Sequence, residues 1–96
     1  MLDRALGMLD RAFALHPQVA LRPEPFGALA YHYGTRKLTF LKHPDIVRVV
    51  SSLAVHASLR DALVAAGIAE TRWPSFERAV VSLVESEMLG ERAVVG

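Results

Sequence analysis

Apolar and polar residues alternate through much of the first half of the chain, which is the pattern of β-strands with one buried face. The alternation covers residues 18–22, 26–33 and 36–42. Gly34 and Thr35 separate the last two segments, and a glycine in the first central position of a two-residue hairpin turn adopts positive φ without strain. We therefore predict a three-stranded antiparallel meander in which the strand over residues 36–42 keeps one unpaired edge.

The faces of these predicted strands differ in composition. In residues 26–33 the larger side chains share one face and the smaller ones the other: Leu29, Tyr31 and Tyr33 against Ala28, Ala30 and His32. Leu38 and Phe40 point to one side of the last strand. They could belong either to the core or to the wall of a groove, because a groove wall is also the outer edge of a core.

The second half of the chain has the spacing of three amphipathic helices. Apolar residues recur at helical spacing over residues 46–53, and Ser58 suits the N-cap of a second helix that Gly67 ends. A third helix is predicted over Ser75–Leu89. Strands followed by helices indicate an α+β fold, here winged helix-turn-helix-like, with a three-stranded antiparallel sheet followed by three helices.

The N-terminal residues contain a duplication, because Met1–Ala5 recurs as Met8–Ala12 one heptad later. The repeat places four apolar residues on one stripe of a short helix: Leu2, Leu6, Leu9 and Phe13. A helix this short is rarely stable alone in water, so the stripe must pack on its own domain or on a partner. We predict an amphipathic helical extension over residues 1–15, a domain over 16–90 and a tail over 91–96, with a homodimer possible through the extension or by strand exchange.

Composition narrows the classes of function. The 96 residues suit one domain, and a net charge of +1 gives no field for attracting phosphates or anionic lipids. The chain contains no cysteine, which excludes disulfides, thiolate metal sites and an iron–sulfur cluster ligated by this chain. No apolar window approaches membrane-spanning length, and charged residues interrupt the start where a secretory signal would be apolar. We expect a cytoplasmic protein that binds neither membrane nor nucleic acid.

Nothing in the spacing of reactive side chains indicates catalysis. The four histidines lie on different predicted segments and form no metal-binding pair: His16, His32, His43 and His56. We expect them to be loop, surface or half-buried residues, and we expect Asp45 to cap or stabilise a helix start. Phosphate-binding loops, nucleophile elbows and kinase signatures are absent from the sequence. We therefore predict that the chain is not an enzyme and has no catalytic residue, metal site or cofactor.

A winged-helix DNA-binding regulator is the alternative function. Its recognition helix would need basic and amide side chains, but the third predicted helix, Ser75–Leu89, offers one basic residue, Arg78, against Glu77, Glu85 and Glu87. Such a helix would repel a duplex. An open strand beside a helix is better suited to capturing an extended peptide by β-strand addition.

The predicted sheet contains a long and specific run of residues. It reads HPQVALRPEPFGALAYHYG over residues 16–34, followed by LTFLK over residues 38–42. This run resembles the mycofactocin-system peptide chaperone family, MftB, which belongs with the PqqD-like precursor-recognition domains of ribosomal peptide biosynthesis. The resemblance extends from about His16 to Leu89. It departs from the broader PqqD-like pattern at residues 52–56, where an Asp-Gly pair commonly ends the first helix.

The resemblance implies a non-catalytic peptide chaperone. It implies that the chain binds the leader of a ribosomally made precursor peptide as an added strand, between the strand 36–41 and the helix 75–89. The chaperone would then present the precursor to a radical S-adenosylmethionine (SAM) maturase, which modifies a C-terminal Val-Tyr in mycofactocin biosynthesis. The implied peptide-binding residues are Lys37, Leu38, Thr39, Phe40 and Leu41 from the strand and Phe76, Arg78, Val81, Ser82 and Glu85 from the helix.

Overall fold

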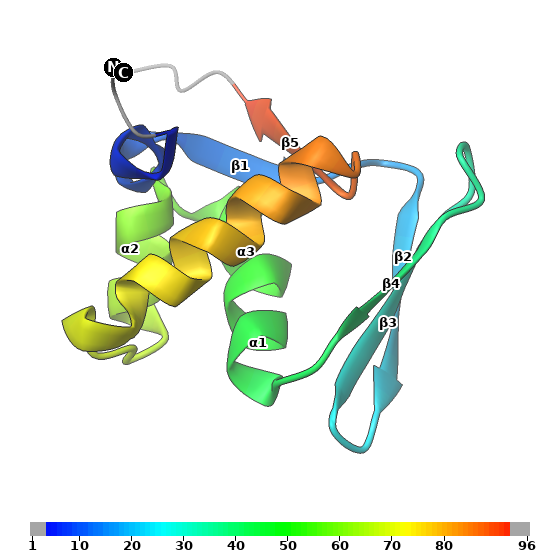
Figure 1. The fold of residues 1–96 in the computed structure, drawn as a ribbon, viewed down its shortest axis with the longest axis horizontal. Coiled ribbons are helices and arrows are strands. Elements are labelled where there is room, and N and C mark those ends of the chain that lie inside the picture. Colours follow the sequence, from blue (N-terminus) through cyan, green and yellow to red (C-terminus); the bar gives the residue numbers. More distant parts are fainter. Residues whose placement is uncertain (1–3, 93–96) are drawn as a thin grey trace.

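The computed structural model describes residues 4–92, and Figure 1 shows how their elements are arranged. Within this range, strands form two antiparallel sheets: β1 Ala12–Leu15 with β5 Leu89–Arg92, and β2 Val19–Glu24, β3 Gly27–His32 and β4 Leu38–Leu41 in the order β2-β3-β4. The α-helices and 3₁₀ helices are α1 Pro44–Ser52, α2 Leu59–Ala65, α3 Trp73–Glu85, η1 Arg4–Asp10, η2 Leu53–Val55 and η3 Glu70–Arg72. The predicted α+β fold, a three-stranded antiparallel sheet followed by three helices, is confirmed.

The helix boundaries follow from local capping. The Asp61 N–H donates to Oγ of Ser58 at 3.1 Å, as expected for the N-cap of α2, and Gly67 ends that helix with φ 73°. At α1 the cap is His43, whose Nδ1 accepts from the Asp45 N–H at 3.1 Å. Asp45 therefore lies in the first turn and does not cap the helix. His43 caps it instead, so it is more than the loop residue that the sequence predicted.

The third helix is shorter than predicted. It spans Trp73–Glu85, whereas the prediction extended it to Leu89. Glu87 adopts φ 66°, and the N–H groups of Glu87 and Met88 donate to the carbonyls of Val84 and Leu83, which is a Schellman motif. Helical spacing of Val84 and Met88 misled the prediction, because Met88 is buried by a reversal of the chain into β5 and not by a further helical turn.

The predicted helical extension over residues 1–15 is wrong for its last four residues. Ala12–Leu15 is the strand β1, whose partner β5 lies almost eighty residues away in sequence. Phe13 is 1% exposed in the core, and its carbonyl accepts a hydrogen bond from Nε of Arg92 at 3.0 Å. Pairing with β5 satisfies the backbone of β1 while burying Phe13, which an isolated short helix cannot do. Leu2, the first residue of the expected stripe, lies outside the described residues.

The hairpin between β3 and β4 has a longer turn than the predicted two residues. The His32 N–H donates to the Lys37 carbonyl, and the loop between them takes its positive φ, 63°, at Arg36 and not at Gly34. Nδ1 of His32 accepts from the N–H groups of Gly34 and Thr35, at 3.0 and 3.1 Å. His32 is 3% exposed, so the expectation of a surface or half-buried side chain is wrong: the ring satisfies the turn from inside.

The inner face of the three-stranded sheet carries the smaller side chains. Ala28 and Ala30 are each 1% exposed, and their small side chains let α1 contact β3. Helices and strands contribute residues to the same core. The largest of the fully buried side chains are Phe13, Val49, Val50, Leu53, Leu59, Leu63, Val80 and Met88. The two faces of β3 alternate as predicted, but it is the alanine face that is buried.

We predict that Gly27→Ala destabilises the fold. A Cβ at this position would lie 1.8 Å from the Leu41 carbonyl oxygen, so β3 and β4 would have to separate. The free energy of unfolding should fall by about 2–3 kcal/mol in urea denaturation, as for overpacked cores. Gly90→Ala is the matched control, because a Cβ there meets nothing within 4 Å. Equal losses in the two variants would contradict the close approach of β3 and β4.

Candidate functional site

Within residues 4–92, β4 is an edge strand with no partner on its outer side, and its hydrogen-bonding pattern shows which peptide groups face that open edge. Because His32 donates to Lys37, the alternation of an antiparallel ladder makes Ala30–Thr39 and Ala28–Leu41 the bonded pairs. The peptide groups of Leu38 and Phe40 therefore point away from β3, toward the open edge. The predicted unpaired edge is thus present. The strand that carries it begins at residue 38, two residues later than in the predicted strand 36–41.

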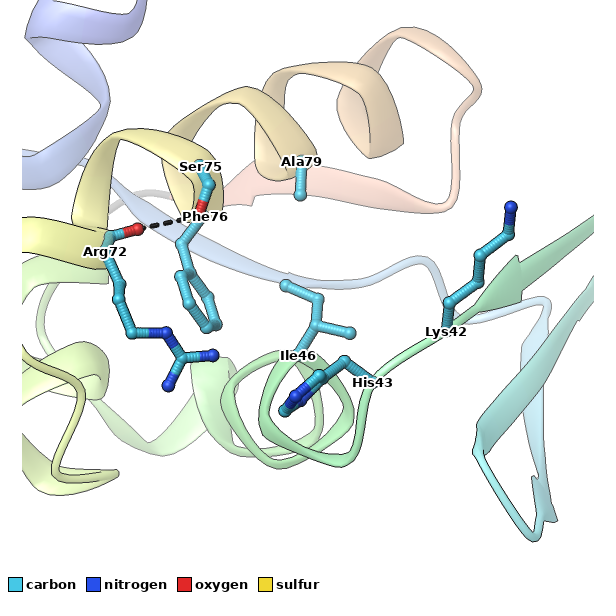
Figure 2. Close-up of a pocket in the computed structure, with 7 residues that line it drawn as sticks. All are labelled: Lys42, His43, Ile46, Arg72, Ser75, Phe76 and Ala79. Carbon is cyan, nitrogen blue, oxygen red and sulfur yellow. Dashed lines mark hydrogen bonds between the residues drawn. The ribbon is translucent and has the colours of Figure 1, made fainter.

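The helix α3 runs beside this edge and forms a groove with it. Two adjoining cavities make up the groove and share Lys42, Ile46 and Ala79. The strand pocket, about 200 Å³, is lined by Thr39, Phe40, Leu41, Lys42, Ile46, Ala79, Ser82 and Leu83. The basic pocket, about 280 Å³, is lined by Lys42, His43, Ile46, Arg72, Ser75, Phe76 and Ala79, as Figure 2 shows. We call the two together the β4–α3 groove.

Half of the peptide-binding residues predicted from the sequence line this groove. They are Thr39, Phe40 and Leu41 from β4 and Phe76 and Ser82 from α3. Leu38 contributes an edge peptide group, but its side chain lies on the outer face of the sheet, 59% exposed.

The other predicted residues lie elsewhere. Lys37 precedes β4, and Arg78 and Glu85 are exposed on α3; none of the three lines either pocket. Val81 lines a separate cavity of about 330 Å³ with Met8, Phe13 and others, on the other side of α3. Neighbours in the sequence of a helix differ by about 100° in direction, so a run of helix residues cannot all face one groove.

Several groove residues were not predicted from the sequence: Lys42, His43, Ile46, Arg72, Ser75, Ala79 and Leu83. A signal for the helix residues was present, because 72, 75, 79 and 82 follow the spacing of one helix face. Small side chains at Ser75, Ala79 and Ser82 leave space beside β4. Which face of α3 meets the strand is decided only by the packing of Phe76, Val80 and Leu83 into the core.

A small ion-pair network lies at the basic end of the groove. Arg48 Nη2 donates to Oδ1 of Asp45 at 2.6 Å, and Arg72 Nη1 donates to Oδ2 at 2.9 Å. Two hydrogen bonds, the more effective from Arg48 and the other from Arg72, hold the pKa of Asp45 below its ordinary value of 3.8. One carboxylate is thus shared by two guanidinium groups, and the network retains net positive charge.

The outer face of the three-stranded sheet carries several apolar side chains, of which Leu38 and Phe40 are exposed and Leu29 and Tyr31 are half-buried. Leu29 lies opposite Phe40 and Tyr31 opposite Leu38 in the ladder, so their side chains share this face. Phe40 is 41% exposed, and Tyr33 packs edge-on against Tyr31 with ring centroids 4.9 Å apart. An extra strand on β4 would continue this face as well as fill the groove.

Among the described residues, no cluster of three or more histidine, cysteine or acidic side chains is arranged to hold a metal ion. Helices in the same part of the chain are too short or too polar to cross a bilayer.

Comparisons with known proteins identify the family. A model described as the peptide chaperone MftB family matches residues 12–90. The chain is 55% identical to peptide chaperone MftB of Mycolicibacterium smegmatis, over 83% of this chain and 78% of the relative. It is 52% identical to that of Mycobacterium ulcerans (83% and 73%) and 49% identical to that of Mycobacterium tuberculosis (86% and 76%). No solved structure matches.

This chain belongs to the MftB family of peptide chaperones. The predicted resemblance is confirmed, as is the prediction that the chain is not an enzyme, because the MftB family is a chaperone family. The MftB family model begins at Ala12, so it includes β1, which the predicted domain start at residue 16 left out. Membership in a family of peptide chaperones implies a peptide partner for this chain.

The ion pairs of Asp45 predict a pH dependence of stability. Its pKa is lowered by folding, so its contribution is present above the unfolded value of about 3.8 and is lost as pH falls through the lowered pKa. In urea denaturation, the stability advantage of the wild type over Asp45→Asn should shrink between about pH 5 and pH 2. Arg48→Met should raise the pKa of Asp45 in an NMR titration, and Arg22→Met should not; the same pKa in all three proteins would contradict the network.

Proposed function

We propose that the β4–α3 groove binds the leader of a ribosomally made precursor peptide as an added β-strand, and that the chain presents this peptide to a radical SAM maturase in mycofactocin biosynthesis. The observation that carries the proposal is the open edge of β4, whose Leu38 and Phe40 peptide groups face a groove walled by α3. The chain would hold the peptide and perform no chemistry.

Main-chain hydrogen bonds would supply affinity that does not depend on the leader's sequence. Leu38 and Phe40 each offer one N–H and one carbonyl to an extended chain. An exposed edge of this kind is usually protected in monomeric proteins, by charge, a bulge or a covering segment. Here the edge residues are Leu38, 59% exposed, and Phe40, 41% exposed, which suits a strand that pairs with another chain.

Side chains of the added strand would alternate between two environments. Those on one side would enter the strand pocket over Leu41, Ile46 and Leu83. Those on the other side would extend the apolar outer face beside Phe40 and Leu38. Binding would thus cover exposed apolar surface on both faces of the strand, which strengthens association by the hydrophobic effect.

The amino-acid composition of the chain, as well as its family, supports a separate maturase. A radical SAM enzyme requires an iron–sulfur cluster, and this chain has no cysteine to ligate one. The chemistry must therefore reside on a separate protein. The chain supplies the peptide, and the maturase supplies the reaction.

Nucleic-acid binding and dimerisation gain no support from the described residues. Arg78 and Glu85 are both exposed on α3, and neither lines a pocket of the groove. Of the expected dimerisation stripe, Phe13 is buried within its own chain at 1% exposure, and Leu9 packs against the same core. A homodimer formed through the N-terminal helix or by strand exchange remains a prediction, as does a cytoplasmic location.

Two variants of Phe40 test strand addition. Phe40→Ala removes the side chain and keeps the N–H, whereas Phe40→Pro also removes the N–H that faces the open edge. Proline is tolerated where a strand's N–H faces outward, so the β3–β4 ladder should persist. Leader peptide should bind Phe40→Pro about 5-fold more weakly than Phe40→Ala in calorimetry, the cost of one hydrogen bond.

Amide NMR of the wild type shows independently where the leader binds. Leader should shift the resonances of Leu38 and Phe40 and of α3, and duplex DNA in modest salt should give no saturable shift. Equal affinities for Phe40→Ala and Phe40→Pro, with both variants folded, would exclude pairing at this edge.

Blocking the groove should also break the relay to the maturase. Ala79 lies in both pockets, so Ala79→Trp should fill the space that the leader's side chains occupy. Ala65→Trp is the matched control, because Ala65 is exposed at the end of α2. Light scattering should show a ternary complex of leader, chaperone and maturase with Ala65→Trp and not with Ala79→Trp. A ternary complex that forms equally with both variants would contradict presentation through the groove.

A further inference from the structure

The basic pocket combines an apolar floor with a cationic rim, and Figure 2 shows both. Ile46 and Phe76 form the floor, with Ala79 above them. Lys42 stands on the β4 side and Arg72 on the α3 side, with His43 at the start of α1. Among the described residues that line the pocket, none is acidic.

The positive charge on this rim exceeds what the protein itself neutralises. Asp45, next to the pocket, accepts from both Arg48 and Arg72, so one negative charge faces two positive ones. In the described part of the chain, Lys42 has neither a hydrogen-bond acceptor nor an ion-pair partner for its ammonium group. Lys42, Arg48 and Arg72 together therefore leave a surplus of two positive charges around a cavity of about 280 Å³.

Arg72 is held in position before any ligand arrives. Its guanidinium lies over the Phe76 ring, 5.3 Å from the centroid, and one end is bonded to Asp45 at 2.9 Å. Its own carbonyl accepts from the Ser75 hydroxyl at 2.8 Å, which Figure 2 marks as a dashed line. A guanidinium has five N–H donors, and Asp45 occupies one end of the fork. Donors remain for a second carboxylate at little further cost in side-chain entropy.

We propose that the basic pocket binds an aspartate or glutamate side chain of the captured peptide. This inference rests on the proposed function of the groove. The methylene groups of a glutamate would lie on Ile46 and Phe76, and its carboxylate would sit between Lys42 and Arg72. The affinity for a peptide thereby depends on the charge of one side chain in the added strand. Main-chain pairing alone does not distinguish one side chain from another.

The neighbouring strand pocket fixes the spacing. It adjoins the basic pocket through Ile46 and Ala79 and presents Leu41 and Leu83 to a ligand. Side chains on the same side of an extended chain are two residues apart, at about 6.6–6.8 Å. The recognised pattern is therefore an acidic residue two positions from an apolar one, the apolar residue entering the strand pocket.

A set of synthetic leaders tests this selection. Each acidic residue of the precursor leader is replaced in turn by its amide, Glu by Gln or Asp by Asn, and binding is measured by calorimetry. One replacement, two positions from an apolar residue, should weaken binding about 10-fold through loss of a charge-assisted pair. The other replacements should change affinity by less than about 2-fold, because they act only through screened surface charge.

Protein variants locate the effect in the pocket. Lys42→Met keeps the apolar stem and removes the charge, so it should weaken leader binding about 10-fold and abolish the difference between the leader and its sensitive amide variant. Arg72→Gln should do the same. Arg22→Met, the same loss of charge on the opposite edge strand β2, should bind within about 2-fold of the wild type and keep the difference.

The outcomes separate this inference from the proposed function. If the leader binds the wild type and all amide variants bind equally, or if Lys42→Met keeps the difference, the acidic subsite is wrong and the groove stands. A leader that binds tightly without any acidic residue would overturn the subsite in the same way. If the leader shows no binding to the wild type, both the groove's function and the subsite fail.

Discussion

The fold depends on the pairing of β1 with β5, which joins the two ends of the described chain. The β1 strand leads directly into the three-stranded sheet, and β5 directly follows α3, so this short ladder fixes the helix relative to the sheet. Arg92 reinforces it by donating to the carbonyls of Phe13, Leu53 and His56. These bonds satisfy carbonyl groups that no ladder reaches, in the part of the core where Phe13 is buried. The distance between β4 and α3, and with it the groove, follows from this arrangement.

The sheet is arranged for use of its edge and its outer face. Alanines face the core, so α1 packs close to β3, while Leu29, Tyr31, Leu38 and Phe40 face outward. A protein selected only for stability would bury the larger side chains, since burial of apolar area is the dominant favourable term in folding. Of these side chains, Leu38 and Phe40 are exposed, and a strand added to β4, as proposed above, would lie beside them.

Histidine has an unexpected structural role in this chain. Nδ1 of His16, His32 and His43 each accepts from the backbone N–H two residues later, at Gln18, Gly34 and Asp45. The ring thus accepts the hydrogen bond that a short polar capping side chain would accept. It is also large enough to pack against a neighbour, since the ring centroids of His16 and His32 lie 4.4 Å apart. These rings lie at the entry to β2, in the β3–β4 turn and at the start of α1.

The sequence by itself determined the elements whose signals are local. Alternation indicated the strands of the meander, and Ser58 and Gly67 marked the ends of the second helix, because caps and periodicity act within a few residues. Local signals misassigned Ala12–Leu15 and the end of α3, since β1 and β5 exist only as each other's partners. They identified the groove's strand, but they could not choose the face of α3 that meets it. That choice follows from which side chains the core accepts, and only the tertiary structure, by burying Phe76 and Val80, turns Ser75, Ala79 and Ser82 toward β4 and brings Lys42 and Arg72 to one cavity.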